Sequence, residues 1–235
     1  MNCTLFPAPP SPDQALLKRL SRLKTSYVSD AFDRWSGAPG IRPISGLRPG
    51  GVVVGPAFTV RTRPGDNLVL HKALDMAAPG DIVTVAGGGA EDRALLGGLM
   101  GLYAATRKIA ALVVDGAVRD LSELQESAPP VFARAISHLG PYKDGPGALR
   151  GPVSISGLVV ECGDLVICDE DGVAVIPRAR ANEVIAAAEA KMAAEMVEES
   201  QIRAGTWDRS WLDARLKLHE VQAPQPGRLL GGEAG

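Results

Sequence analysis

The chain has 235 residues, 46% of them hydrophobic and 22% charged, which suffices for one ordinary core, so we expect a single domain over 1–235. Its 25 Lys and Arg against 27 Asp and Glu give a net charge of −2, too little positive charge for a general nucleic-acid binder. Three cysteines without a CxxC pair argue against a disulfide scaffold. No window reaches the roughly 18 apolar residues of a membrane span and no signal peptide is evident, so we expect a cytoplasmic protein.

The first part of the chain predicts an irregular arm and two short helices. Residues 1–13 are rich in proline and lack periodicity. Leucines at amphipathic helical spacing follow, at positions 16, 17, 20 and 23. Residues 25–35 predict a second helix, capped by Ser26 or Ser29.

The next segment mixes a strand and a helix. Residues 50–63 are rich in β-branched side chains but contain Gly55-Pro56, which predicts either one bulged strand or two short ones. Residues 66–77 have a helical pattern.

A βαβ unit is predicted at about 81–115. An apolar strand over 82–86, a helix over 95–108 and an apolar strand over 109–115 follow one another, so the strands are expected to be parallel with a right-handed crossover. The ends of both strands and the start of the helix then meet at one edge of the sheet.

The remainder predicts mostly strands and one long helix. The strands are expected at 131–135, 153–160, 165–168 and 173–177. Residues 169–172 predict a hairpin turn, 179–201 an Ala- and Glu-rich helix, and 206–235 a polar C-terminal tail. The pattern as a whole is that of an α/β protein with mixed strands.

The predicted crevice at the sheet edge has carboxylates but no histidine cluster. The three histidines are far apart in the sequence, so any metal is expected to be a hard cation such as Mg²⁺ or Mn²⁺ that retains several waters. The available carboxylates are Asp115, Asp120, Glu123, Glu91 and Asp92.

A glycine-rich helix start adds an anion site to the same crevice. Residues 97–101 expose backbone N–H groups at the positive end of a helix dipole, although they lack the signatures of a nucleotide loop. Arg119 can fork onto a carboxylate, while Asp120 can hold a divalent ion that polarises the neighbouring carbonyl. Together they predict a 2-oxo acid site. The alternatives are that the glycines serve only close packing and that Arg119 and Asp120 form a surface pair.

Residues 79–123, PGDIVTVAGGG to ALVVDGAVRDLSE, resemble the RraA-like family, which includes class II pyruvate aldolases acting on 4-hydroxy-4-methyl-2-oxoglutarate (HMG) and 4-carboxy-4-hydroxy-2-oxoadipate. The stretches VSDAFDRW, VVVGPAFTVRTRPGDNLVLHKAL, PVFARA and GDLVICDEDGVAVIP extend the resemblance to roughly residues 20–205. It implies the family's swivelling-type ββα sandwich with a mixed central sheet, assembled as a homotrimer or a hexamer.

The family signature D-x20-R-D-x2-E/D places the implied site. Arg119, Asp120 and Glu123 match its second half, whereas Gly98 stands where the signature has Asp. By resemblance, Asp120 is the catalytic ligand of Mg²⁺ or Mn²⁺, Arg119 binds the pyruvyl group, and Glu123 lies beside them. The substitution at Gly98 puts the metal-bound water network in doubt or marks a different substrate.

The backbone amides of Gly98, Leu99 and Met100 are the remaining candidates for substrate binding, since amides do not depend on side-chain identity. In the family a further catalytic Glu comes from the C-terminal helix of a neighbouring subunit. Glu195 is the preferred candidate and Glu199 the next, with a solvated helix face as the alternative.

Two hypotheses follow for function. The first is a divalent-metal-dependent lyase that cleaves a 2-oxo acid by retro-aldol chemistry, or decarboxylates one such as oxaloacetate, through a pyruvate enolate. The second is a non-catalytic regulator that binds a ribonuclease or another protein, as some members of the resembled family do.

Overall fold

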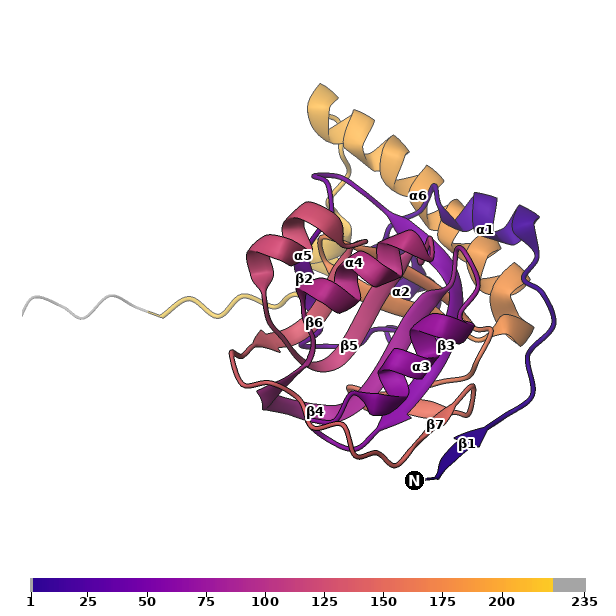
Figure 1. Ribbon diagram of the computed structural model, residues 1–235. Helices are drawn as coiled ribbons and strands as arrows, with labels where there is room; N and C mark the ends of the chain where they lie inside the picture. The colour runs from indigo at the N-terminus through magenta and orange to yellow at the C-terminus, as the bar shows by residue number, and fades with distance from the viewer. Residues whose placement is uncertain (1, 222–235) are drawn as a thin grey trace, which may run out of the picture. The chain divides into compact units, whose positions relative to one another are not determined.

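The computed structural model describes residues 2–221 and confirms an α/β protein with a mixed central sheet (Figure 1). The described strands are β1 (Cys3–Leu5), β2 (Arg42–Ser45), β3 (Val53–Thr62), β4 (Ile82–Leu96), β5 (Ala111–Val118), β6 (Val131–Ile136), β7 (Gly147–Leu149), β8 (Val153–Ile155), β9 (Leu158–Val160), β10 (Leu165–Asp169) and β11 (Gly172–Ile176). The helices are α1 (Gln14–Leu20), α2 (Thr25–Ala31), α3 (Leu68–Met76), α4 (Gly98–Thr106), α5 (Leu121–Ser127), α6 (Ala181–Ala204) and α7 (Trp211–Arg215), with a 3-10 turn at Arg178–Arg180.

Two compact units divide the chain, residues 1–194 and 195–235, and the division falls within α6. The predicted C-terminal tail, 206–235, contains a short helix, α7. Its residues 222–235 lie outside the described part of the chain. No helix among residues 2–221 is long and apolar enough to span a membrane. The expectation of a single domain stays a prediction.

The predicted βαβ unit is confirmed and belongs to a longer parallel run. The main sheet has the order β1-β7-β3-β4-β5-β6-β2, and β3, β4, β5 and β6 are parallel neighbours. The C-terminal ends of β3, β4 and β5 consequently lie at one edge of the sheet. A backbone hydrogen bond of 2.9 Å from Arg119 N to Leu96 O joins the chain leaving β5 to the end of β4.

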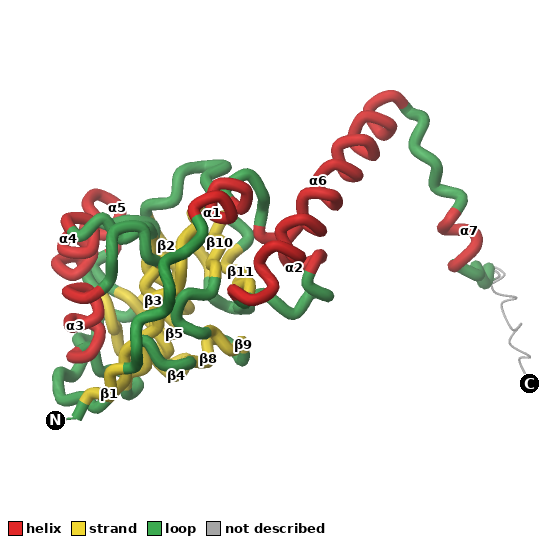
Figure 2. The backbone as a smooth tube through the Cα atoms, turned by 90° about the vertical axis from the view of Figure 1, so that its right-hand side faces the viewer, coloured by secondary structure: helices red, strands yellow, loops and turns green. Residues whose placement is uncertain are grey.

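Helices α3, α4 and α5 cover one face of the sheet, as the ribbon and the tube views both show (Figures 1 and 2). Alternate residues of the central strands, such as Val83 and Val85, pack against these helices, whereas Ile82 faces the opposite side. On that side Ile82 joins a second cluster with β8, β9, β10 and β11, and a third cluster packs the other face of β10 and β11 against α1, α2 and the start of α6. The period of two in the strands thus creates two apolar faces and the layered sandwich.

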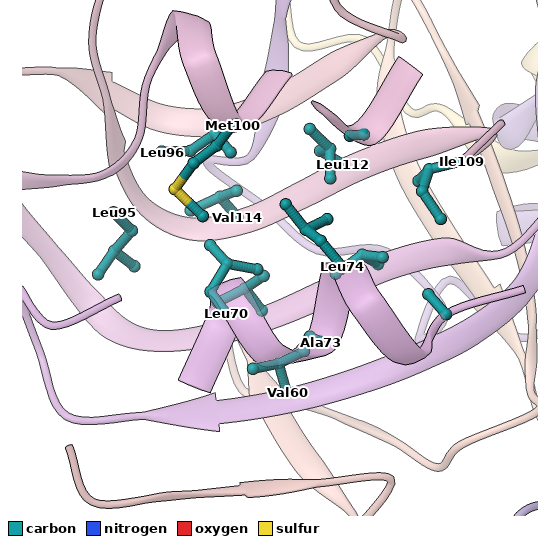
Figure 3. Close-up of a cluster of buried hydrophobic side chains, with 14 of the residues drawn as sticks. Val60, Leu70, Ala73, Leu74, Leu95, Leu96, Met100, Ile109, Leu112 and Val114 are labelled. Atoms are coloured by element: carbon teal, nitrogen blue, oxygen red, sulfur yellow. The ribbon is translucent and has the colours of Figure 1, made fainter. Parts of the chain in front are cut away.

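The core beneath α3 and α4 is aliphatic (Figure 3). Leu70 and Leu74 from α3 meet Leu112 and Val114 from β5, and all four side chains are fully buried. This packing holds α3 and α4 on the sheet, and the same two helices begin at the sheet edge described above.

Several sequence predictions were wrong in detail. The single strand predicted over 153–160 is divided by a turn at residues 156–157 into β8 and β9, which pair antiparallel. Residues 1–13 are not wholly irregular, because Cys3–Leu5 forms β1 and pairs in parallel with β7. Strand β4 continues beyond the predicted end at residue 86, with bulges beside β5, because Gly88 and Gly89 adopt positive φ angles of 72° and 70° that let the chain re-pair. The cap of α2 is neither Ser26 nor Ser29.

The α2 start is capped by a residue far away in the sequence. The Asp169 carboxylate accepts from Thr25 N at 2.8 Å and from Thr25 Oγ1 at 2.6 Å. Of the two alternatives predicted for residues 50–63, the structure has a single strand, β3. Pro56 lies at the point where the strand paired with β3 changes from β10 to β4. A proline without an N–H is compatible with that changeover point.

Truncation of Leu74 to Ala is expected to lower the free energy of unfolding by about 2–5 kcal/mol, because the side chain is fully buried between α3 and the sheet. Urea denaturation at one protein concentration measures the change. Leu218→Ala, at an 80% exposed position, is the control and is expected to stay within about 0.5 kcal/mol of the wild type. Equal losses in both variants would contradict this assignment of the core.

Candidate active site at the sheet edge

Arg119 and Asp120 lie directly after β5, as the sequence predicted. Asp120 occupies the position before α5 in a left-handed conformation, with φ 55° and ψ 53°. A non-glycine residue in that region carries backbone strain, which is typical of functional sites. Its Oδ2 accepts a hydrogen bond from Gly98 N at 3.1 Å and lies 3.4 Å from Arg119 Nε. Both side chains remain about 40% exposed, at 39% for Arg119 and 40% for Asp120.

Gly97 makes the approach of Asp120 to α4 possible. A Cβ built on Gly97 would lie 2.4 Å from Asp120 Oδ2 and 3.2 Å from Arg119 Cγ, so any larger residue would displace the carboxylate. Glycine is required here for close approach of a side chain to the helix start.

At Gly98, the position that departs from the family signature, the side chain of Glu123 fills the space that a larger residue would need. A Cβ on Gly98 would lie 2.6 Å from Glu123 Cβ and 3.5 Å from Asp120 Cβ. The side chain of Glu123 thus packs where a side chain at position 98 would begin. The prediction that Glu123 lies beside the pair is consistent with this contact.

The amides proposed to bind substrate divide into two groups. Gly98 N–H donates to Asp120 Oδ2, and its predicted role in binding a substrate carboxylate stays a prediction. Leu99 and Met100 are in the first turn of α4, where backbone amides have no partner within the helix. Their assignment to substrate stays a prediction.

A pocket of about 130 Å³ opens at this edge, and its walls come from four segments. It is lined by Asn67, His71, Leu96, Gly97, Leu99, Met100, Arg119, Asp120, Pro141 and Lys143. The lining side chains carry two permanent cations, Arg119 and Lys143, against one carboxylate, Asp120. The pocket therefore favours an anionic ligand.

Asn67 and His71 were missed by the sequence analysis. Asn67 is 3% exposed, and its Nδ2 donates to Leu95 O at 3.1 Å and to Met100 Sδ at 3.2 Å. Its Oδ1 has no hydrogen-bond partner among the described residues and is available to a donor group. Partial burial and the charge of Lys143 lower the pKa of His71 despite the opposing effect of Asp75, and this shift favours the neutral imidazole.

The other predicted carboxylates do not line the pocket. Asp115 is buried and forms an ion pair with Arg134, while Glu91 and Asp92 lie within β4. No group of three or more His, Cys, Asp or Glu side chains that could hold a metal occurs among residues 2–221. A single carboxylate, Asp120, is compatible with Mg²⁺ or Mn²⁺ that takes its other ligands from water and substrate. The residues do not fit a metal site built entirely from protein ligands.

Glu195 and Glu199, the candidates from the C-terminal helix, are both on α6 and belong to the second unit. Glu199 accepts a hydrogen bond of 2.9 Å from Arg203 Nε, one turn further along the helix. Their catalytic role stays a prediction.

Comparison with known proteins identifies the family of this chain. Residues 25–175 match the family model described as RraA-like, Aldolase/RraA. The chain is 36% identical over 181 residues, 77% of its length and 85% of the relative's, to a Halalkalibacterium halodurans protein named "Putative 4-hydroxy-4-methyl-2-oxoglutarate aldolase".

Solved structures of similar fold support the same family assignment. An uncharacterized Pseudomonas syringae protein shares 29% identity at a TM-score of 0.73, covering 83% of this chain and 95% of that one. The RNA-processing inhibitor RraA from Thermus thermophilis shares 30% identity at a TM-score of 0.59, covering 66% of this chain and 92% of that one. With the family model covering more than half of its length, the chain belongs to the RraA-like family.

Proposed function

We propose that this protein is a divalent-metal-dependent lyase that cleaves a 2-oxo acid by retro-aldol chemistry, or decarboxylates one, through a pyruvate enolate. The observation that carries the proposal is the placement of Asp120 and Arg119 at one pocket with the first turn of α4. The aldolase name of the Halalkalibacterium halodurans relative supports the same chemistry.

The substrate is held at its carboxylate end. The Arg119 guanidinium accommodates a carboxylate in bidentate fashion, and the amides of Leu99 and Met100 add donors at the positive end of the α4 dipole. Lys143 supplies a second positive charge to the pocket. These contacts orient the acid so that its 2-oxo group lies toward Asp120.

Asp120 would hold the Mg²⁺ or Mn²⁺. When bound, the ion polarises the 2-oxo group and stabilises the negative charge that develops on its oxygen. Gly98 N–H fixes one oxygen of Asp120 at 3.1 Å, which orients the carboxylate before any ligand binds. Asn67 Oδ1 is available to accept a hydrogen bond from a hydroxyl group or a water in the pocket.

In the retro-aldol reaction the 4-hydroxyl group loses its proton to a water in the pocket, its oxygen forms a carbonyl at C4, and the C3–C4 bond breaks as its electrons pass toward the 2-oxo group. The new carbonyl compound that contains C4 then leaves. In decarboxylation the bond to the distal carboxylate breaks instead, and carbon dioxide leaves. Both routes yield a pyruvate enolate, which is protonated to pyruvate. One site can therefore serve both reactions.

The active assembly is proposed to be a homotrimer or a hexamer, to which Glu195 of a neighbouring subunit contributes. In support, α4 presents an apolar surface beside the pocket, with Leu99 86%, Leu102 48% and Tyr103 42% exposed. Large apolar side chains gathered at one surface are typical of a subunit interface. Sedimentation of the purified protein tests the assembly.

A second candidate function is a non-catalytic regulator that binds a ribonuclease or another protein. The similarity to the Thermus RNA-processing inhibitor RraA favours it. Such a role needs surface complementarity and does not require Asp120, which is the point at which the two functions separate.

The decisive experiment measures pyruvate release from oxaloacetate and from HMG by EDTA-treated protein, with Mg²⁺ or Mn²⁺ added back. Metal is expected to restore turnover above the rate without enzyme. Asp120→Ala and Asp120→Asn are expected to lower kcat/KM by about 100-fold or more, because the charge that holds the ion is lost.

Asp92→Ala is the matched control, since this exposed carboxylate lies on β4 outside the pocket. It is expected to keep wild-type activity. No turnover of either acid with either metal would sink the lyase proposal and leave the regulator, whose binding of a partner is expected to survive Asp120→Ala.

Gly97→Ala is expected to lower kcat/KM by about 10- to 100-fold while the fold persists, because the new methyl group displaces the Asp120 carboxylate by an ångström or more. Steady-state kinetics and a thermal unfolding curve measure the two effects. Gly37→Ala is the control, since its Cβ would have only one neighbour, Val173 O at 4.0 Å. Wild-type kinetics in Gly97→Ala would show that the observed Asp120 position is not the active one.

A further inference from the structure

The loop between β6 and β7 supplies one wall of the pocket through Pro141 and Lys143. It has little regular structure of its own, so its position depends on contacts with other segments. The first part of the loop is bonded to β4, and residues 142–145 are bonded to residues 65–67, immediately before α3.

Backbone hydrogen bonds join the loop to that segment. Tyr142 N donates to Gly65 O at 2.8 Å, and Asn67 N donates to Tyr142 O at 3.0 Å. Between these two bonds lies Asp66, a residue that is 0% exposed.

The carboxylate of Asp66 links the loop to the start of α3. Its Oδ2 accepts from Asp144 N at 2.7 Å and from Gly145 N at 2.9 Å, and its Oδ1 accepts from Leu68 N at 3.0 Å. Arg63 Nη2 lies 3.5 Å from Oδ2. Burial opposes ionisation of this group, but the three amides and Arg63 outweigh it, so the pKa of Asp66 lies below its usual value.

The outer side of the loop has a second, weaker attachment. Two guanidinium groups lie over the ring of Tyr142, with Arg93 Cζ 4.2 Å and Arg63 Cζ 5.1 Å from its centroid. Arg93 also donates to Gly140 O. Because these groups are partly solvated, they stabilise the loop less than the buried carboxylate does.

We propose that Asp66 is a positioning residue for the lyase reaction, which anchors the loop over residues 140–145 so that Lys143 faces the pocket opposite Asp120. The proposal rests on the proposed function. Asp66 does not line the pocket and acts through the loop. Its neighbour Asn67 binds Leu95 O and Met100 Sδ, so adjacent residues hold two different walls of the pocket.

The test is Asp66→Asn, which keeps the size of the side chain but turns an amide donor toward backbone donors. Hydrogen exchange of the Asp144 and Gly145 amides is expected to accelerate at least about 10-fold, because they lose their acceptor. The KM for the 2-oxo acid is expected to rise about 10-fold, with a smaller change in kcat, since the loop contacts the substrate rather than the metal site.

Asp164→Asn is the matched control. Asp164 is 6% exposed and accepts from Glu161 N at 2.8 Å and from Arg178 N at 2.9 Å, but it does not line the pocket. It is expected to lower the thermal midpoint while leaving KM and the exchange of the loop unchanged. If Asp66→Asn behaves in the same way, Asp66 is only structural and the proposal is overturned.

A double-mutant cycle with Lys143→Ala identifies the route. Lys143→Ala alone is expected to raise KM, and to add little when Asp66 is already Asn, because both changes remove the same contact. Fully additive effects would overturn the proposed coupling.

Tyr142→Ala, at a 48% exposed position, keeps the proposal testable if Asp66→Asn fails to fold. It is expected to shift exchange and KM in the same direction by a smaller factor, and no shift would overturn the proposal. If the wild type turns over neither acid, the proposed function fails, while the exchange measurement still decides whether Asp66 holds the loop.

Discussion

The parallel alignment of β3, β4 and β5 is the constraint on which the site depends. Because all three strands end at the same edge, the turn after β3, the start of α4 and the turn after β5 meet there. The apolar clusters on the two faces of the sheet hold the strands in register and press α3 and α4 onto it. Aliphatic packing in the core therefore brings the polar residues of the pocket together, and those polar residues take no part in that packing.

At that edge, the polar groups are oriented before any ligand binds. Asp120 adopts a left-handed conformation and bonds to Gly98 N–H, an approach that only glycine at position 97 permits. Strain at Asp120 is tolerated because α5 and the end of β4 hold the backbone on both sides. Asp66 performs the same kind of task for the loop that carries Lys143, with three backbone amides as its partners.

Sequence reasoning located the half of the site that is local in the chain. Arg119, Asp120 and the glycine-rich start of α4 fall within one βαβ unit, whose geometry follows from its pattern of strand, helix and strand. Asn67 and His71 were missed because β3 was not recognised as a parallel neighbour of β4, and Lys143 was missed because its loop is placed at the pocket by contacts with residues 65–67, far away in the sequence. The signal was present in the helical pattern that follows β3 directly, since two other walls of this pocket, after β4 and after β5, also begin where a strand is followed by a helix.

The sequence by itself determined the α/β fold class with mixed strands, through periodicity and turn residues, and the Arg119–Asp120 pair, through a contiguous motif, whereas the family and its layered sandwich followed from the resemblance of several stretches to known proteins. Only the tertiary structure decided which carboxylates are already committed, as Asp115 is to Arg134, and that Gly98 N–H binds Asp120. It also decided that Glu123 packs at position 98 and that Asp66 holds the loop. Some of these contacts join residues that are far apart in the sequence, and others depend on differences of a few tenths of an ångström between atoms. Neither composition nor residue spacing carries that information.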